Sequence, residues 1–163
     1  MLSRNGSRSA AALAAAALAL VAASLLGAVA ATRGPAVIDA LYPEVRTTLA
    51  LAQLAQREPL RADESFRVVA LGRDAHTSHH VVHIRGAETP HRHDTHDLVV
   101  VVLRGHGQML LGTERRPVCE GSILYIPRGT VHAFANESGE PAAAYAMYTP
   151  PFDGKDKVDV EVK

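Results

Sequence analysis

The sequence predicts an all-β fold, closed or double-layered and built from antiparallel strands, that follows a targeting segment and a short helix. Two observations support this prediction. After residue 66 the chain is a series of short apolar runs, evenly spaced and separated by Gly, Pro, Asp or Asn. Residues 10–31 differ from this pattern, because they contain 13 alanines and no charged residue. The chain therefore divides into a leader and a β domain.

The composition excludes several classes of function. The 163 residues include 17 Lys and Arg against 17 Asp and Glu, with three Phe, four Tyr and no Trp. A chain with neither a basic surface nor an aromatic stacking platform is not expected to bind nucleic acid. A single cysteine also excludes an internal disulfide, a zinc ribbon and a CxxC redox motif.

Residues 1–30 have the organisation of a secretory signal peptide. Arg4 and Arg8 precede the uncharged stretch, which ends in the small-residue pattern Ala28-Val29-Ala30. We expect cleavage near residue 31 and export to the periplasm or the medium. The alternative is an uncleaved membrane anchor formed by residues 10–31, since 22 apolar residues can span a bilayer core.

Residues 31–62 have a helical pattern. Tyr42-Pro43-Glu44 suits a first helical turn, and apolar residues follow at helical spacing from Val45 to Ala52. The pattern predicts a helix over residues 43–57 that packs against the β domain.

Residues 63–163 form the predicted β domain and its C-terminal arm. The predicted strands are residues 66–71, 79–84, 98–103, 108–111, 123–126, 131–135 and 142–148. The tail has apolar residues at alternate positions, namely Val158, Val160 and Val162. This alternation predicts a last edge strand or an arm that packs on a neighbouring molecule. Cys119 is interpreted as a small buried residue on a strand.

The histidines carry the chemistry, and all nine lie between His76 and His132. Residues i and i+2 of a strand project to the same face, so His91 and His93 can converge on one point inside a barrel. Imidazole is a common ligand of Zn, Fe, Cu, Ni and Mn, so this pair is a candidate metal site.

The stretch from residue 121 to residue 136 strengthens this hypothesis, because it resembles the second motif of the cupin superfamily. The fixed positions of that motif, G-x5-P-x-G-x2-H-x3-N, are matched by Gly121, Pro127, Gly129, His132 and Asn136. The first cupin motif is matched by His91, His93 and Gly105. The resemblance covers residues 66–148 and implies a cupin-type jelly-roll β-barrel.

The resemblance also implies that His91, His93 and His132 bind one divalent transition metal, which could be Fe, Mn, Ni, Zn or Cu. Turn chemistry at Pro127 and Gly129 agrees with this, since it returns the chain as a new strand that can carry His132 inward. The alternative is a metal-free barrel with histidines packed in a pocket. Three inward imidazoles without a ligand would leave buried polar atoms unpaired, which favours the metal.

The family's glutamate ligand is missing from this sequence. Its position falls on Leu98, seven residues before Gly105, and Asp97 and His96 are adjacent. If the strand of His93 continues regularly, Asp97 points inward. If a bulge lies near Asp94-Thr95, the site consists of three histidines only. We expect a three-histidine site with Asp97 nearby or weakly bound.

Residues 98–103 are apolar on both faces of their predicted strand. The outward face must then be covered, either by the helix at 43–57 or by a second subunit. The cupin resemblance favours the subunit, so we expect a homodimer.

Two classes of function remain for this domain. The first is an exported metal-dependent enzyme with oxygenase-type or isomerase-type chemistry on a small molecule, and the second is a non-catalytic module that binds a small ligand or a metal. No Ser-His-Asp set, glycosidase carboxylate pair, HExxH motif or P-loop supports another chemistry. Glu88 is interpreted as an orienting partner of a ligand imidazole or as a solvated acid. Tyr125, Tyr145 and Tyr148 are candidates to face the metal.

Overall fold

The computed structural model describes residues 36–41 and 46–162 of the chain. The predicted signal peptide lies outside these residues. Within the described part, no helix is both long enough and apolar enough to cross a bilayer.

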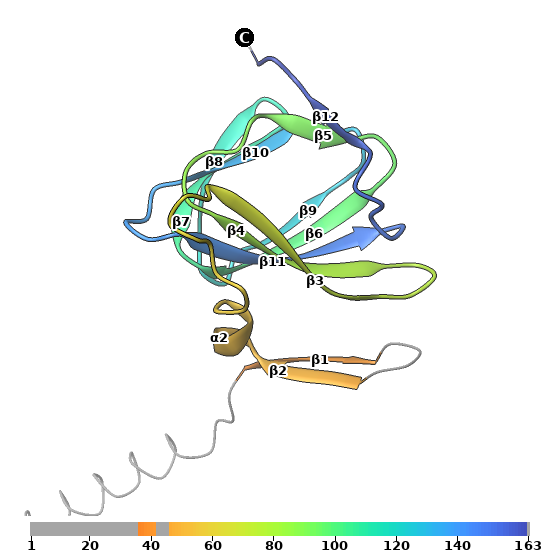
Figure 1. Cartoon of the computed structure of the whole chain (residues 1–163). Coiled ribbons are helices and arrows are strands. Elements are labelled where there is room, and N and C mark those ends of the chain that lie inside the picture. Colours follow the sequence, from red (N-terminus) through yellow and green to blue (C-terminus); the bar gives the residue numbers. More distant parts are fainter. Residues whose placement is uncertain (1–35, 42–45, 163) are drawn as a thin grey trace, which may run out of the picture. The chain divides into compact units, whose positions relative to one another are not determined.

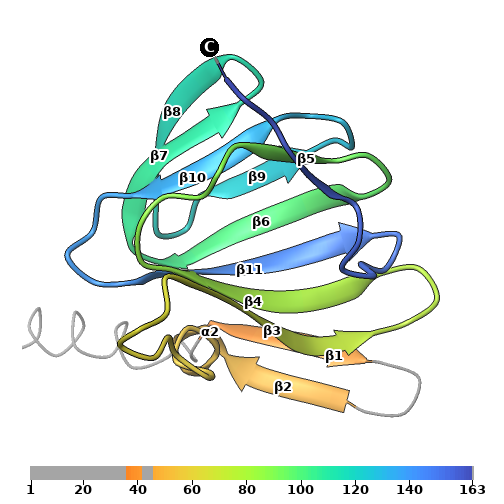
Figure 2. The ribbon, with the colours of Figure 1, turned by 45° about the horizontal axis from the view of Figure 1, so that its top comes forward.

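Two five-stranded sheets make up the β domain (Figures 1 and 2). The first sheet contains, in spatial order, β12 (Lys157–Asp159), β5 (His91–His93), β10 (His132–Asn136), β7 (His106–Leu111) and β8 (Glu114–Cys119). The second contains β3 (Phe66–Arg73), β4 (Ser78–Ile84), β11 (Ala142–Thr149), β6 (Asp97–Arg104) and β9 (Ile123–Ile126). Neighbouring strands are antiparallel throughout both sheets. The predicted all-β, double-layered fold is confirmed.

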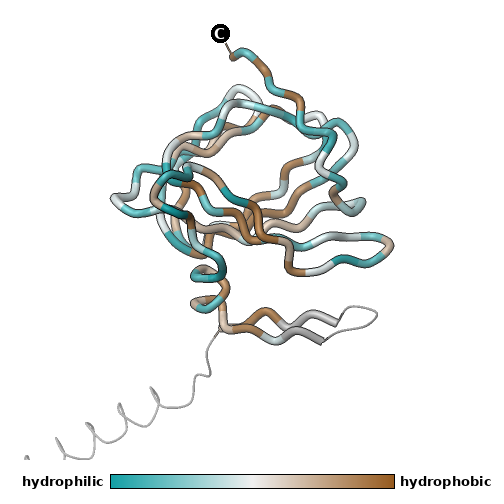
Figure 3. The backbone as a smooth tube through the Cα atoms, in the orientation of Figure 1, coloured by the Kyte–Doolittle hydropathy of each residue, from teal (hydrophilic) through white to brown (hydrophobic). Residues whose placement is uncertain are grey.

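The chain crosses repeatedly from one sheet to the other, and the core lies between them. Figure 3 shows hydrophobic segments along the strands and hydrophilic ones in the connecting loops. Burying one large apolar side chain contributes about 1.5–3 kcal/mol to stability. The central cluster consists of Ile84, Leu98, Val102, Met109, Leu124, Ile126, Phe134, Ala142, Ala146 and Tyr148.

The C-terminal tail forms an edge strand, as the alternation predicts. Strand β12 pairs with β5 of the same chain, with Val158 opposite Arg92. Cys119 differs from its predicted burial, because it lies exposed at the end of β8, the opposite edge of this sheet.

The predicted helix over residues 43–57 begins outside the described residues, and over residues 46–57 the prediction is wrong except for one turn. Strands β1 (Val37–Leu41) and β2 (Arg46–Ala50) form an antiparallel pair, and only α2 (Leu51–Leu54) is helical. β-branched Thr47 and Thr48 favour the strand conformation, and pairing with β1 satisfies the backbone. Packing of apolar side chains onto the second sheet then overrides the helical spacing.

This N-terminal segment covers part of the outer face of the second sheet. Leu54, Val69 and Val81 are buried together there. The half-buried residues around them are Ile38, Leu49, Leu51, Leu71, Leu103 and Tyr145. The outward side of β6 is therefore covered at Leu103, but by a hairpin and one helical turn in place of a long helix.

Candidate metal centre

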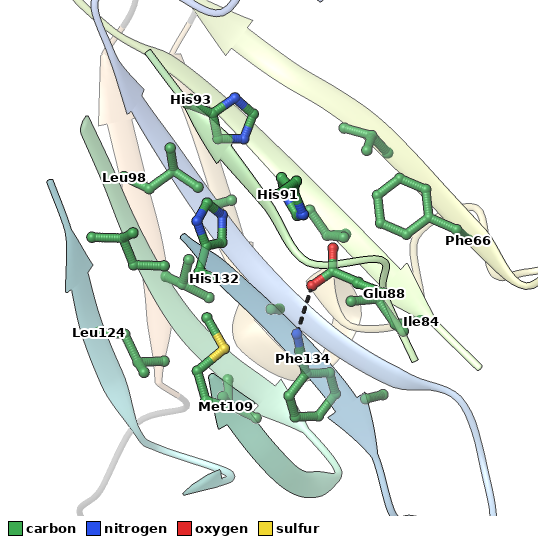
Figure 4. A pocket seen from close by; sticks show the side chains of 18 of the residues that line it. Phe66, Ile84, Glu88, His91, His93, Leu98, Met109, Leu124, His132 and Phe134 are labelled. Atoms are coloured by element: carbon green, nitrogen blue, oxygen red, sulfur yellow. Dashed lines mark hydrogen bonds between the residues drawn. The ribbon is translucent and has the colours of Figure 1, made fainter. Parts of the chain in front are cut away.

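Three histidines meet on the inner face of the first sheet. His91 and His132 are directly opposite each other in the pairing of β5 with β10, and His93 lies two residues along β5. All three side chains are buried, with 5%, 3% and 4% exposure for His91, His93 and His132. One nitrogen of each ring lies within 4.8 Å of the other two (Figure 4). The structure thus brings together the three predicted ligands.

Each imidazole is oriented by a hydrogen bond from Nδ1. His91 Nδ1 lies 2.9 Å from the Thr89 carbonyl oxygen, and His132 Nδ1 lies 2.9 Å from the Thr130 carbonyl oxygen. His93 Nδ1 lies 2.9 Å from a carboxylate oxygen of Asp156. Carbonyl and carboxylate oxygens only accept, so Nδ1 carries the proton and Nε2 presents its lone pair. Among the described residues, no hydrogen bond engages these three Nε2 atoms.

Burial keeps the imidazoles of His91 and His132 neutral. Burial, and the neighbouring His91 and His93, lower the pKa of His132 to about 4, even though the Thr130 carbonyl opposes this. Burial also lowers the pKa of His91. Neutral imidazole is the form that binds metals, so these rings are ready to bind at neutral pH.

The residues present fit a divalent transition metal. Nitrogens bound to one Zn²⁺ at about 2.0–2.1 Å in tetrahedral geometry lie about 3.3 Å apart, which the bound of 4.8 Å allows with a small movement of the rings. Three neutral nitrogens with open positions suit Zn, Fe, Cu, Ni or Mn. Carbonyl and carboxylate partners behind the rings are the usual outer shell of such a centre.

Asp97, which is expected nearby or weakly bound, lies outside the group of converging ring nitrogens, which contains the three histidines. Its carboxylate accepts hydrogen bonds from the backbone N–H and the guanidinium of Arg128, at 2.8–3.1 Å. These bonds lower the pKa of Asp97 to about 2. The alternation of inward and outward side chains does not continue from His93 to Asp97. The chain bends at Asp94-Thr95 and passes from the first sheet to the second. Leu98 then faces the core and is 4% exposed.

His96 is buried beside the cluster without joining it. Its Nδ1 lies 2.5 Å from Asp156, whose carboxylate also accepts from His93 and from the N–H and hydroxyl of Thr95. Burial alone would raise the pKa of Asp156, but the hydrogen bonds from His96, His93 and Thr95 hold it below its ordinary value. Asp156 therefore stays ionised and ties the C-terminal segment to both histidines.

A cavity of about 140 Å³ adjoins the three histidines. Most of its wall is apolar, contributed by both sheets, and Phe66 and Val68 lie half-exposed on its rim. The other polar groups on the wall are Glu88, Tyr148 and Lys157. An engineered apolar cavity of about 150 Å³ holds benzene, so the space suits a small molecule.

A family model identifies this fold in sequence, and an uncharacterised relative matches the chain as well. The model described as "Cupin domain" matches residues 78–148. An uncharacterised protein of Aquifex aeolicus (strain VF5) is 38% identical over 99 residues, which is 61% of this chain and 81% of that protein. The chain belongs to the cupin superfamily. The expected jelly-roll barrel is thereby confirmed.

Solved structures agree with this assignment. A double-stranded β-helix protein of Klebsiella pneumoniae superposes with a TM-score of 0.57 and 16% identity, covering 70% of this cupin and 96% of that chain. Pac13 of Streptomyces, described as a nucleoside dehydratase, superposes with a TM-score of 0.51 and 17% identity, covering 60% of this cupin and 79% of that chain. At these identities the likeness concerns the fold alone.

The motif residues of this cupin position the ligand strands. Gly129 has φ +77° in the turn before β10, and its N–H donates to the His93 carbonyl oxygen at 2.7 Å. The turn is thus joined to β5, which explains the glycine, since a side chain is disfavoured at this φ. The Asn136 side-chain amide donates to three backbone carbonyls and closes the loop that follows β10.

The remaining candidates lie elsewhere or take other roles. Tyr125 is exposed on β9, and Tyr145 packs on the outer face of the second sheet, with its hydroxyl 2.5 Å from His79 Nδ1. Only Tyr148 of the three lines the cavity of this cupin. Glu88 bonds to the Phe134 backbone and not to a ligand imidazole. The role of Asp156 could not be predicted from the sequence. Its carboxylate accepts from His93, which lies 63 positions away, and no local pattern around Asp156 indicates this contact.

Proposed function

We propose that this protein is an exported, metal-dependent cupin that binds one divalent transition metal through His91, His93 and His132 and acts on a small molecule in the adjoining cavity. The convergence of one nitrogen from each of three oriented imidazoles beside an apolar cavity supports this function most strongly.

A bound metal would supply a Lewis acid or a redox centre at the cavity wall. The residues of the chain hold His91 and His132 neutral, supply a largely apolar lining, and place Glu88 and Tyr148 beside the bound molecule. Isomerase-type or oxygenase-type chemistry fits this arrangement. The Pac13 description, a nucleoside dehydratase, indicates that the fold can host catalysis on small molecules.

Elemental analysis of the mature protein, purified from its own host, tests the metal site. We expect about one divalent ion per subunit. The double substitution His91→Ala and His132→Ala removes two of three ligands and should abolish binding, whereas His106→Ala, at an exposed residue of β7, should leave it unchanged. An unchanged metal content in the double variant would reject the site. A loaded wild type without turnover of any small molecule would favour the non-catalytic binding module.

Export is proposed from the leader alone. Arg4, Arg8 and the pattern Ala28-Val29-Ala30 support cleavage, after which the mature chain begins near Ala31 in the periplasm or the medium. N-terminal sequencing of the native protein checks this. A soluble protein that retains Met1 would contradict export, and an intact protein in the membrane fraction would favour an anchor formed by residues 10–31.

A further inference from the structure

Glu88 occupies an unusual place for an acidic residue. It lies between β4 and β5, three residues before His91, and its side chain lines the cavity among apolar neighbours. Figure 4 shows it between the histidines and Ile84, on the same wall as Phe134. Burial raises the pKa of this carboxyl, although the bond from the Phe134 backbone N–H opposes the shift. Glu88 is only partly buried, but a molecule that filled the cavity would remove its carboxyl group from water, and an unpaired buried charge is costly.

One of the two oxygens of this carboxyl group, Oε2, is held by a backbone hydrogen bond. The Glu88 N–H donates to the Phe134 carbonyl oxygen at 2.9 Å, and the Phe134 N–H donates to Glu88 Oε2 at 3.0 Å. This pair of bonds continues the bridge between Ala87 and Ala135. The side chain therefore cannot turn out to solvent without breaking a bond to β10.

The second carboxyl oxygen, Oε1, has no hydrogen bond among the described residues. It points away from Phe134, into the cavity toward the side where His91 lies (Figure 4). Lys157 is the only cation on the described cavity wall, and no ion pair joins it to Glu88. The Lys157 ammonium lies 3.6 Å from Asp159 instead. An acceptor thus faces the cavity without a hydrogen bond to the described residues.

We propose, in extension of the proposed function, that Glu88 recognises the bound molecule, which is small, largely apolar and carries one N–H or O–H donor. The apolar wall accommodates the hydrocarbon part, and Glu88 Oε1 accepts from the donor. A ligand that lacked the donor would leave this carboxyl buried and unpaired, which makes the donor a condition of tight binding.

Glu88→Gln reverses the polarity of this contact without removing the backbone bond. The amide oxygen must stay on the Phe134 N–H, so the amide NH2 takes the place of Oε1 and turns an acceptor into a donor. Cyclohexanol and cyclohexanone are suitable probes, because they share one skeleton and differ in the donor. Dissociation constants for both are measured by NMR titration of the zinc-loaded protein at pH 8. Glu140→Gln, at an exposed acid, is the control.

We expect wild type and Glu140→Gln to prefer the alcohol over the ketone, and Glu88→Gln to shift this ratio by about tenfold toward the ketone. A ratio equal in all three proteins, or no binding of either probe to wild type, would overturn the role of Glu88. Zinc content measured on the same samples separates the two proposals. Absence of zinc from wild type contradicts the proposed function, whereas an unchanged ratio in the loaded protein contradicts only the role of Glu88.

Discussion

His132 shows how strongly burial acts on a single side chain in this cupin. Its pKa is about 4 in the folded protein, against about 6.5 in an unfolded chain. Between these values the unfolded state binds more protons, so stability falls as the pH falls from 6.5 to 4. For one buried histidine this amounts to roughly 2–3 kcal/mol.

We therefore predict that the metal-free protein loses stability toward acid pH and that His132→Gln has a shallower pH dependence. Urea unfolding between pH 7 and pH 4.5, in the presence of a chelator, measures this. His106→Gln, at an exposed residue of β7, should follow wild type. Identical slopes for wild type and His132→Gln would show that His132 is not held neutral by the fold.

Leu98 occupies the position at which the family carries its glutamate, and it faces the cavity beside the histidines (Figure 4). We predict that Leu98→Glu binds zinc more tightly than wild type, because an anionic oxygen joins three neutral nitrogens. Without metal the same variant should be destabilised by several kcal/mol, since a buried acid is then unpaired. Melting temperatures with and without zinc measure both effects, and Leu98→Gln is the uncharged control.

For a substitution of Asp97, in contrast to Leu98→Glu, we expect no effect on zinc binding. Its carboxylate already accepts three hydrogen bonds from Arg128, so Asp97→Asn should leave zinc affinity unchanged. A Leu98→Glu variant with unimproved affinity, together with an Asp97→Asn variant that loses zinc, would reverse this assignment.

At the scale of elements, the C-terminal segment supports the metal centre through Asp156. Loss of a partner behind a ligand histidine typically lowers metal affinity by about 10–100-fold. We predict a loss in this range for Asp156→Asn, measured by competition with a zinc chelator. Asp153→Asn lies on the same segment but only accepts from the Lys155 N–H, and should bind zinc normally. Equal affinities in the two variants would limit Asp156 to a structural role.

The strands could be predicted from the sequence because their spacing and their apolar alternation are local. The three histidines could be predicted as well, from one i, i+2 pair and one turn motif. Strand β5 has only three residues, so no periodicity marks it. The N-terminal hairpin was missed because packing against the second sheet, and not the local pattern, selects it. The position of the Glu88 side chain could not be predicted, because the sequence does not reveal which backbone group binds its carboxyl group.

In the molecule as a whole, one apolar surface lacks a cover among the described residues. Ile123 and Tyr125 on β9 are 73% and 63% exposed, opposite the half-buried Val101 and Val99 of β6. The N-terminal hairpin reaches Leu103 and Tyr145 of this sheet but not these residues. Adjoining apolar side chains of this kind mark interaction surfaces.

We predict that a second subunit covers this surface and that the protein is a homodimer. Light scattering at micromolar concentration should give twice the chain mass for wild type. Ile123→Asp combined with Tyr125→Ser should give a monomer with retained zinc binding, because the cavity lies on the other face of the sheet. A monomeric wild type would leave the N-terminal hairpin as the only cover of the outer face within the described chain.

The hydrogen bonds that orient the three imidazole rings also bear on how the proposed centre would acquire its metal. Thr89, Thr130 and Asp156 orient the imidazoles, and the Gly129 N–H joins the turn to β5. In the proposed centre the protein's own hydrogen bonds orient the ligands, whereas small zinc domains fold only as they bind the ion. A rigid three-nitrogen site follows the general affinity order, in which copper and zinc outcompete manganese and iron. For the proposed centre, the supply of ions where the chain folds would therefore decide which metal is bound.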